Sequence, residues 1–200
     1  MSDNIAPRYP LVSPGALTAL QRPIHDHITA VSTAAFGLNA PFEWRDRNGA
    51  LLGPFTMLLY TPSIGTGFFD HVMTVMKDEG LPKRVKELVI VAVAAHYGSV
   101  YEIKAHTNLA LLTGLSEKQI EQVIADIEPD GLDDAERAAY RFAVQILRSR
   151  GPVPVEAWDS ALAHWGQERV ATLVYLVGSY SYVSMVLNAA AVGYPDDSSA

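Results

Sequence analysis

Residues 84–123 read RVKELVIVAVAAHYGSVYEIKAHTNLALLTGLSEKQIEQV, and this stretch decides the fold class. Its apolar residues recur at helical spacing, and Gly98 and Gly114 stand where glycine commonly ends a helix. The pattern therefore predicts consecutive helices separated by short turns. The first of them is strongly apolar after Glu87, which predicts a central, buried position for it.

Helix starts are marked by capping signatures. At 99–102 and 116–119 a serine is followed three residues later by Glu or Gln, and at 133–136 an aspartate is followed by Glu. In a capping box the two side chains bond each other's backbone N–H groups, which the helix itself leaves free. We therefore expect a new helix to begin at each of these positions.

The same helical signals continue over most of the chain, and no segment alternates apolar and polar residues long enough to indicate a sheet. Turn formers and aromatic residues at 39–54 predict a loop lying over the body of the protein, and more turn formers occur at 62–65. The fold class is therefore predicted to be all-α. Further helices are expected over 16–38 with an early break at Pro23, 68–77, 133–150, 155–164 and from 167 onward.

The chain is long enough for one ordinary domain with a single core. We divide it into an N-terminal arm, helix and loop at 1–55, which pack on the core, and a helical domain at 56–196. A short tail follows at 197–200.

The composition excludes several classes of function. A formal net charge of -7 leaves no basic surface for a phosphate backbone, so no nucleic-acid partner is expected. The sequence has no cysteine, which excludes disulfides, thiolate nucleophiles and cysteine-ligated metal sites. That composition fits a reducing compartment, and the first residues lack the basic flank and apolar run of a signal peptide, so a cytoplasmic location is expected.

Residues 170–193 contain no charged residue and are long enough to cross a bilayer. Serines, tyrosines and an asparagine interrupt the segment, which favours burial in a protein core or subunit interface over insertion into lipid. We therefore expect no membrane partner. Because such an apolar helix would be unfavourable on the surface of a monomer, we expect a homo-oligomer.

Among the six histidines, His106 is distinguished by the residues before it on the same predicted helix. Glu102 lies one turn earlier and Ser99 two turns earlier, so the three side chains share a helical face. A neighbouring carboxylate fixes the imidazole tautomer and raises its basicity, as a general acid or base near neutral pH requires. Glu87, the lone carboxylate leading into the apolar run of the preceding helix, is a candidate for a partly buried acid.

A purely structural explanation also accounts for each of these residues separately. Ser99 and Glu102 would form only a capping box, and His106 would be a solvated helix residue. Glu87 would be an acid in a first turn that offsets the helix dipole. A structure showing whether His106 faces an enclosed pocket separates the two explanations.

The stretch 84–123 also resembles the core of the carboxymuconolactone decarboxylase and alkylhydroperoxidase-D-like family. The flanking segments LPKRVKELVI (81–90) and LVYLVGSYSYVSMVLNAAAVGYPD (173–196) resemble its longer members, so the likeness covers most of residues 50–196. The resemblance implies an alkylhydroperoxidase-D-like helical bundle whose apolar helices pack between subunits, as trimers or as hexamers built from two trimers.

In the peroxidase branch of the family, a Glu is followed by Cys-x-x-Cys and then by a His four residues later. Glu87, Ser99, Glu102 and His106 occupy that frame here, so both redox cysteines are replaced and the resemblance does not extend to thiol peroxidase activity. The remaining Glu-x-x-x-His pair is similar to the decarboxylase branch. It implies that Glu102 and His106 act as an acid/base pair without a metal or organic cofactor, with Glu87 as a proton-relay or pocket residue.

Substrate-binding candidates are chosen by their proximity in sequence to this pair. Ser99 and Tyr101 are candidates for hydrogen bonds to the substrate, although Tyr101 points to another side of the helix. Arg84 is a candidate for binding beside a substrate carboxylate, together with Lys83 and Lys104.

We expect a cofactor-independent lyase of the carboxymuconolactone decarboxylase type, acting on a small carboxylated lactone or related ring-cleavage metabolite of aromatic compound catabolism. Two alternatives stay open from the sequence. One is a lactone hydrolase or isomerase that uses the same pair, and the other is a non-catalytic oligomeric binding protein that has lost the family's thiol chemistry. The pocket walls cannot be located from the sequence, and a fold alone does not determine a function.

Overall fold

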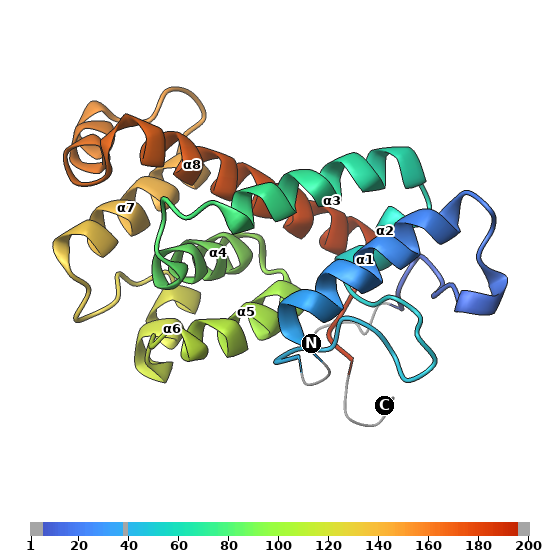
Figure 1. Cartoon of the computed structure of the whole chain (residues 1–200). Helices are drawn as coiled ribbons and strands as arrows, with labels where there is room; N and C mark the ends of the chain where they lie inside the picture. The colour runs from blue at the N-terminus through green and yellow to red at the C-terminus, as the bar shows by residue number, and fades with distance from the viewer. Residues whose placement is uncertain (1–5, 38–39, 196–200) are drawn as a thin grey trace.

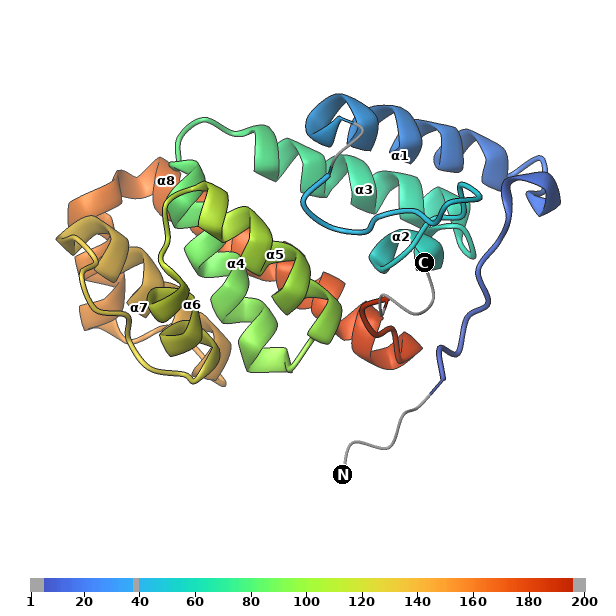
Figure 2. The same cartoon turned by 90° about the horizontal axis from the view of Figure 1, so that it is seen from below.

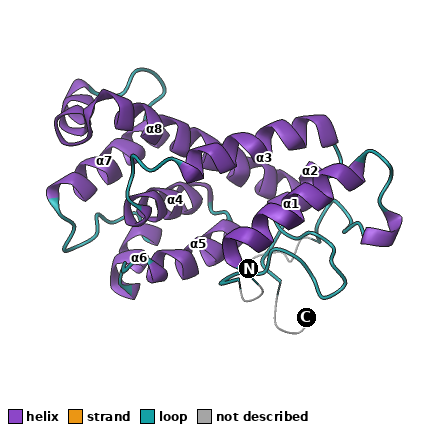
Figure 3. Cartoon of the chain, viewed as in Figure 1, coloured by secondary structure: helices purple, strands orange, loops and turns teal. Residues whose placement is uncertain are grey.

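The structure is a computed structural model that describes residues 6–37 and 40–195 (Figure 1). Within these ranges it contains helices and no named strand, and one isolated β-bridge joins Arg45 and Leu51 (Figure 3). The predicted all-α class is therefore confirmed, while the predicted 197–200 tail lies outside the described residues. In chain order the elements are the 3-10 turn η1 (Pro14–Ala16), α1 (Gln21–Phe36), α2 (Pro54–Leu58), α3 (Pro62–Lys77), α4 (Lys83–Tyr97), α5 (Val100–Leu112), α6 (Glu117–Ile124), α7 (Asp134–Arg148) and α8 (Val155–Ala190).

Helix α4 forms the centre of the fold, as its apolar run predicts. Every residue from Val85 to Ala94 is buried, and α4 packs against α5, α6, α7 and α8. Figure 1 shows α8 extending along the molecule, with α4, α6 and α7 near one end of it and α1–α3 near the other. The main core cluster joins α4 to α8 through residues such as Val89 and Leu173.

Local capping interactions fix where the helices next to α4 begin and where α4 itself ends. Reciprocal bonds between Ser116 and Gln119 begin α6, and a matching pair of Asp133 and Glu136 begins α7, so both predicted capping boxes are confirmed. Gly98 adopts a left-handed φ of 62° and ends α4 so abruptly that α5 starts two residues later. This tight turn sets α5 back against α4 and brings side chains of the two helices together.

Helix α3 is longer than predicted, and the turn expected at 62–65 is wrong. The helix begins at Pro62 instead of Phe68, with the proline in its first turn, where no N–H is needed. Gly65 lies inside the helix, at a point where an added Cβ would be 2.5 Å from the carbonyl oxygen of Leu58. This glycine therefore permits a close approach of α3 to the end of α2 and does not break the helix.

The N-terminal region packs on this body. Helix α1 begins at Gln21, so Pro23 falls in its first turn and does not interrupt it. The predicted loop then lies over the protein (Figure 2). Hydrogen bonds tie it to α5, because the Asn108 amide donates to the Pro41 carbonyl at 2.7 Å.

Helix α8 contains a break at Gly166, whose φ of 71° and ψ of 165° are not helical. The two helices expected on either side of this glycine are therefore present as separate segments. In the described part of the chain, α8 is the one helix long and apolar enough to cross a membrane, but half of its most apolar window is buried within the chain. Such partial burial is typical of a core helix. After Gly166, its outer face exposes four large apolar side chains, here called the α8 stripe: Val174, Tyr175, Tyr182 and Met185.

Candidate active site

Glu87, Glu102 and His106 form one buried cluster between α4 and α5. The Nδ1 atom of His106 lies 2.7 Å from Oε2 of Glu87, and its Nε2 atom lies 3.3 Å from Oε2 of Glu102. All three side chains are at most 10% exposed. The apolar burial of α4 holds Glu87 in place, and the Gly98 turn brings the His106 face of α5 against it.

The two carboxylates make His106 a cation. Burial by itself would lower the pKa of the imidazole. The charges and close contacts of Glu87 and Glu102 outweigh this effect and raise the pKa of His106 to about 10. At neutral pH the Nδ1–H group therefore donates to Glu87, and the Nε2 atom lies 3.3 Å from the Glu102 carboxylate. With both carboxylates ionised, the cluster carries a net negative charge.

These contacts contradict the explanation of Ser99, Glu102 and His106 as a capping box followed by a solvated helix residue. Ser99 is the N-cap residue of α5, but its side chain makes no capping bond and its Oγ has no hydrogen-bond partner. Glu102 lies beside His106 instead, so the capping-box prediction at 99–102 is wrong. His106 is 8% exposed and is not a solvated helix residue. The cluster therefore does not have the features of a simple helix cap with a surface ion pair.

The arrangement suits proton transfer better than nucleophilic catalysis. An activated serine needs a hydrogen bond to its base, and the Ser99 hydroxyl has none. Both nitrogens of His106 face carboxylates, so the imidazole is placed to hold and move a proton. Across residues 6–37 and 40–195, no group of three or more His, Cys, Asp or Glu side chains is arranged to hold a metal ion.

Tyr180 of α8 is a member of the site that sequence reasoning missed. Its ring packs edge to face against His106, with centroids 5.0 Å apart and planes at 88°. Burial, and the charges of Glu87 and Glu102, raise the pKa of the Tyr180 phenol well above its usual value. Tyr180 lies on an uncharged helix far along the chain from His106, and no local motif marks it.

The structure directs Tyr101 away from the acid–base cluster. Its ring is buried on another side of α5, and its hydroxyl donates to the backbone carbonyl of Glu43 at 2.5 Å. Gly53 packs so closely against the ring that a Cβ at that position would collide with it. Tyr101 therefore anchors the loop over α5, and its predicted contact with substrate has no support in the geometry.

The predicted carboxylate-binding side chains are also engaged elsewhere. The Arg84 guanidinium donates to Glu136 at 2.6 Å and to Gln119 at 3.3 Å, which ties α4 to α7 and α6. The Lys104 ammonium lies 5.4 Å from the ring centroid of Tyr194. The structure thus does not bring Arg84 or Lys104 together with His106.

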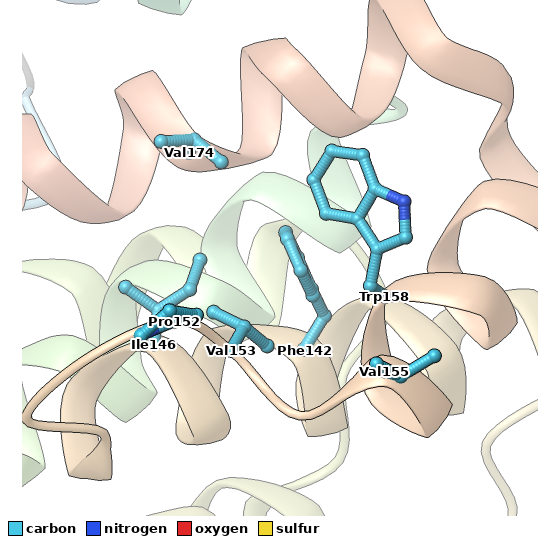
Figure 4. A pocket seen from close by; sticks show the side chains of 7 residues that line it. All are labelled: Phe142, Ile146, Pro152, Val153, Val155, Trp158 and Val174. Carbon is cyan, nitrogen blue, oxygen red and sulfur yellow. The ribbon is translucent and has the colours of Figure 1, made fainter.

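Two surface hollows lie away from the cluster. The smaller, of about 190 Å³, lies among α4, α6 and α7 and includes His96 and Tyr140. The larger, of about 410 Å³, has no group that can transfer a proton, so its size does not make it a reaction site. Figure 4 shows its entirely apolar lining by Phe142, Ile146, Pro152, Val153, Val155, Trp158 and Val174.

Residues 62–145 match the model of the carboxymuconolactone decarboxylase family. The predicted resemblance to this family is therefore confirmed over that segment. The matched segment runs from the start of α3 into α7 and contains all three residues of the acid–base cluster. No curated protein matches the chain.

Solved structures share the fold of this chain. One is the crystal structure of an alkylhydroperoxidase AhpD core, an uncharacterised peroxidase-related protein from Ralstonia eutropha JMP134. It is 20% identical, with a TM-score of 0.74, and the match covers 96% of this chain and 93% of that chain. The debrominase Bmp8 in complex with 2,3,4-tribromopyrrole is 16% identical, with a TM-score of 0.71 and coverage of 95% and 94%. At these identities the likeness shows the fold alone, and it confirms the predicted alkylhydroperoxidase-D-like bundle.

Proposed function

We propose that this protein is a cofactor-independent lyase of the carboxymuconolactone decarboxylase type. It removes carbon dioxide from a small carboxylated lactone or related ring-cleavage metabolite by general acid–base catalysis. The observation that carries the proposal is the buried imidazole of His106, held between Glu87 at 2.7 Å and Glu102 at 3.3 Å. The match of residues 62–145 to the carboxymuconolactone decarboxylase family supports the reaction class.

The two contact distances suggest different roles for the two carboxylates. Glu87 makes the shorter contact, so we assign it the role of orienting His106 through Nδ1. The longer contact of Glu102 leaves Nε2–H as the proton that can be exchanged with a substrate. This reverses the sequence-based prediction, in which Glu102 was the orienting partner.

In the proposed reaction the bond between the substrate and its carboxylate carbon breaks, and carbon dioxide leaves. The electron pair of that bond moves into a conjugated carbonyl group and forms an enolate. Proton transfer from Nε2 of His106 to carbon then restores the neutral carbonyl. A substrate that displaces Glu102 removes one of the groups that raise the pKa of His106, which makes this proton easier to release.

We also propose that no thiol takes part, because Ser99 and Glu102 stand where the peroxidase branch carries its cysteines. Lactone hydrolysis or isomerisation by the same pair is the alternative within enzyme function. A non-catalytic binding protein is the alternative outside it. We further propose a homo-oligomer, a trimer or hexamer with the α8 stripe at its interface, located in the cytoplasm.

The test uses carboxymuconolactone as the probe and follows release of carbon dioxide. His106→Gln should lower kcat by roughly two to four orders of magnitude, the usual contribution of a positioned acid. Glutamine is preferred to alanine because its amide can still donate to the two buried carboxylates, which alanine would leave unpaired. The control is His164→Gln, which changes an exposed histidine outside the cluster.

Each outcome assigns one of the functions. Wild-type turnover in His106→Gln would contradict the catalytic role of the cluster. Consumption of the lactone without carbon dioxide would identify the hydrolase or isomerase. Binding of the lactone without any reaction in the wild-type protein would favour the non-catalytic alternative.

A further inference from the structure

Two buried hydroxyl groups, one at the start of α5 and one on α8, have no hydrogen-bond partner. Ser99 and Ser184 are both 0% exposed, and the Oγ atom of each lacks a partner. A buried hydroxyl without a partner is unfavourable, so each such group in a native structure requires an explanation. Helix capping is not the explanation for Ser99, because its side chain makes no capping bond.

Contacts between α8 and the α4–α5 unit place Ser184 near the cluster. At one end, Tyr180 packs on His106 with ring centroids 5.0 Å apart. At the other end, the Asn188 amide donates to the Tyr97 carbonyl at 2.7 Å. Between these two contacts, Val183 and Leu187 of α8 share an apolar cluster with Tyr101 and Ala105 of α5.

Ser184 lies midway between these two contacts, one helical turn from Tyr180 and one from Asn188. On the α5 side of this contact, Glu102 and Ser99 lie between His106 and Tyr97 in the chain, and Ser99 precedes Glu102 by about one helical turn. The two unpartnered hydroxyls thus belong to helices that pack on each other beside His106.

We propose that the Ser99 and Ser184 hydroxyls bind the carbonyl oxygen of the substrate and stabilise the negative charge that it acquires when carbon dioxide leaves. This inference rests on the proposed function. Hydroxyl donors placed where charge develops in the transition state are an established source of catalysis. The site would then take a substrate whose departing carboxylate is conjugated to a neutral carbonyl group.

The charges around the cluster favour a carbonyl oxygen over the substrate carboxylate at this position. Glu87 and Glu102 outnumber the single cation of His106. Two nearby cations are engaged, because Arg84 pairs with Glu136, and the buried Lys86 ammonium donates to carbonyls at the end of α3. A carboxylate bound here would be repelled from the start, whereas a carbonyl oxygen is neutral when it binds and accepts hydrogen bonds from the hydroxyls as charge develops on it.

This binding mode orients the substrate and requires a local movement. With its carbonyl oxygen at the two serines, the substrate presents the carbon to be protonated toward Nε2 of His106, and its carboxylate departs from the opposite side. Because both hydroxyls are covered in the structure, a substrate reaches them only when the Ser184 turn of α8 moves away from α5.

The experiment compares Ser99→Ala and Ser184→Ala with the matched control Thr29→Val. Thr29 carries the third buried, unpartnered hydroxyl of the described residues, but it lies on α1. Thermal denaturation, turnover of carboxymuconolactone and NMR titration with the neutral lactone butenolide are measured for each variant.

Removal of an unpartnered hydroxyl should leave the melting temperature unchanged or higher in all three variants. In the two serine variants, affinity for butenolide should fall about tenfold and kcat about a hundredfold, the scale of losing one donor to a developing oxyanion. Thr29→Val should keep wild-type affinity and kcat.

The inference is overturned if butenolide does not bind the wild-type protein, or if both serine variants keep wild-type kcat and butenolide affinity. The two hydroxyls would then hold a buried water or serve packing only. If His106→Gln is inactive in the same series, the proposed function survives that result. Full activity of His106→Gln would instead remove the proposed function itself.

Discussion

Replacing Glu87 by glutamine should lower the pKa of His106 from about 10 toward about 7. The charge of Glu87 is the largest influence that raises this pKa, and the contacting atoms are 2.7 Å apart. Two unit charges centred about 4 Å apart interact by about 4 kcal/mol at an effective dielectric constant of about 20. At about 1.4 kcal/mol per pKa unit, loss of that interaction corresponds to about three units.

The pKa is measured by NMR titration of the imidazole nitrogens in protein labelled at histidine. His106 is assigned by comparison with His106→Gln. Glu102→Gln is the matched control, and it should lower the pKa of His106 by less because its contact is longer, at 3.3 Å. A wild-type His106 that titrates near 6.5, or a Glu87→Gln variant that still titrates near 10, would refute the reasoning.

The same shift predicts how stability depends on pH. The pKa of His106 is raised in the folded state, from 6.5 to about 10, by Glu87 and Glu102 against the effect of burial. The ion-pair contribution is therefore fully present below pH 6.5 and is lost as the pH rises through about 10. Wild-type protein should exceed Glu87→Gln in free energy of unfolding by up to about 4 kcal/mol near pH 6, and this difference should shrink toward pH 10. Urea unfolding at several pH values measures it, and a difference independent of pH would contradict the assignment.

Three further predictions concern assembly, packing and chemistry. Tyr175→Asp places a charge in the α8 stripe and should convert the homo-oligomer into monomers of 21.7 kDa, measured by light scattering. Leu20→Asp changes an exposed apolar residue elsewhere and should leave the oligomer intact, while a monomeric wild-type protein would disprove the oligomer prediction. Gly53→Ala should lower the free energy of unfolding in urea by about 2 kcal/mol or more, because φ is 60° and the added Cβ would collide with Tyr101. Gly15→Ala places its Cβ in open space and should not change stability, so equal stability of the two variants would contradict this packing. Turnover should survive chelators and thiol-blocking reagents, and inhibition by a chelator that zinc or manganese reverses would establish a metal requirement.

Local sequence signals predicted the helices around α4 well, since their ends depend on nearby residues. The glycine at 98 and the capping boxes at 116–119 and 133–136 act through bonds within a few residues. The same local reasoning failed where packing used the residue differently. Gly65 was interpreted as a turn former, but it is a helical residue that allows α3 to approach Leu58 closely.

The signature at 99–102 shows a second kind of failure. A capping box satisfies local N–H groups, but here Glu102 lies beside His106, and Ser99 is left without a partner. The preference for a cap is worth about 1 kcal/mol. A buried charge left without its partner costs about 3–5 kcal/mol, so the tertiary ion pair outweighs the local motif.

The sequence by itself determined the all-α class, the absence of cysteine, and the shared helical face of Ser99, Glu102 and His106, because these follow from composition and helical spacing. Only the tertiary structure decided that Glu87 is the closest partner of His106, across 19 residues of chain, and that Tyr180 covers the ring. It also decided that Arg84 pairs with Glu136 instead of facing the cluster. These contacts join side chains of different helices, so they depend on where the helices cross and not on any local pattern of residues.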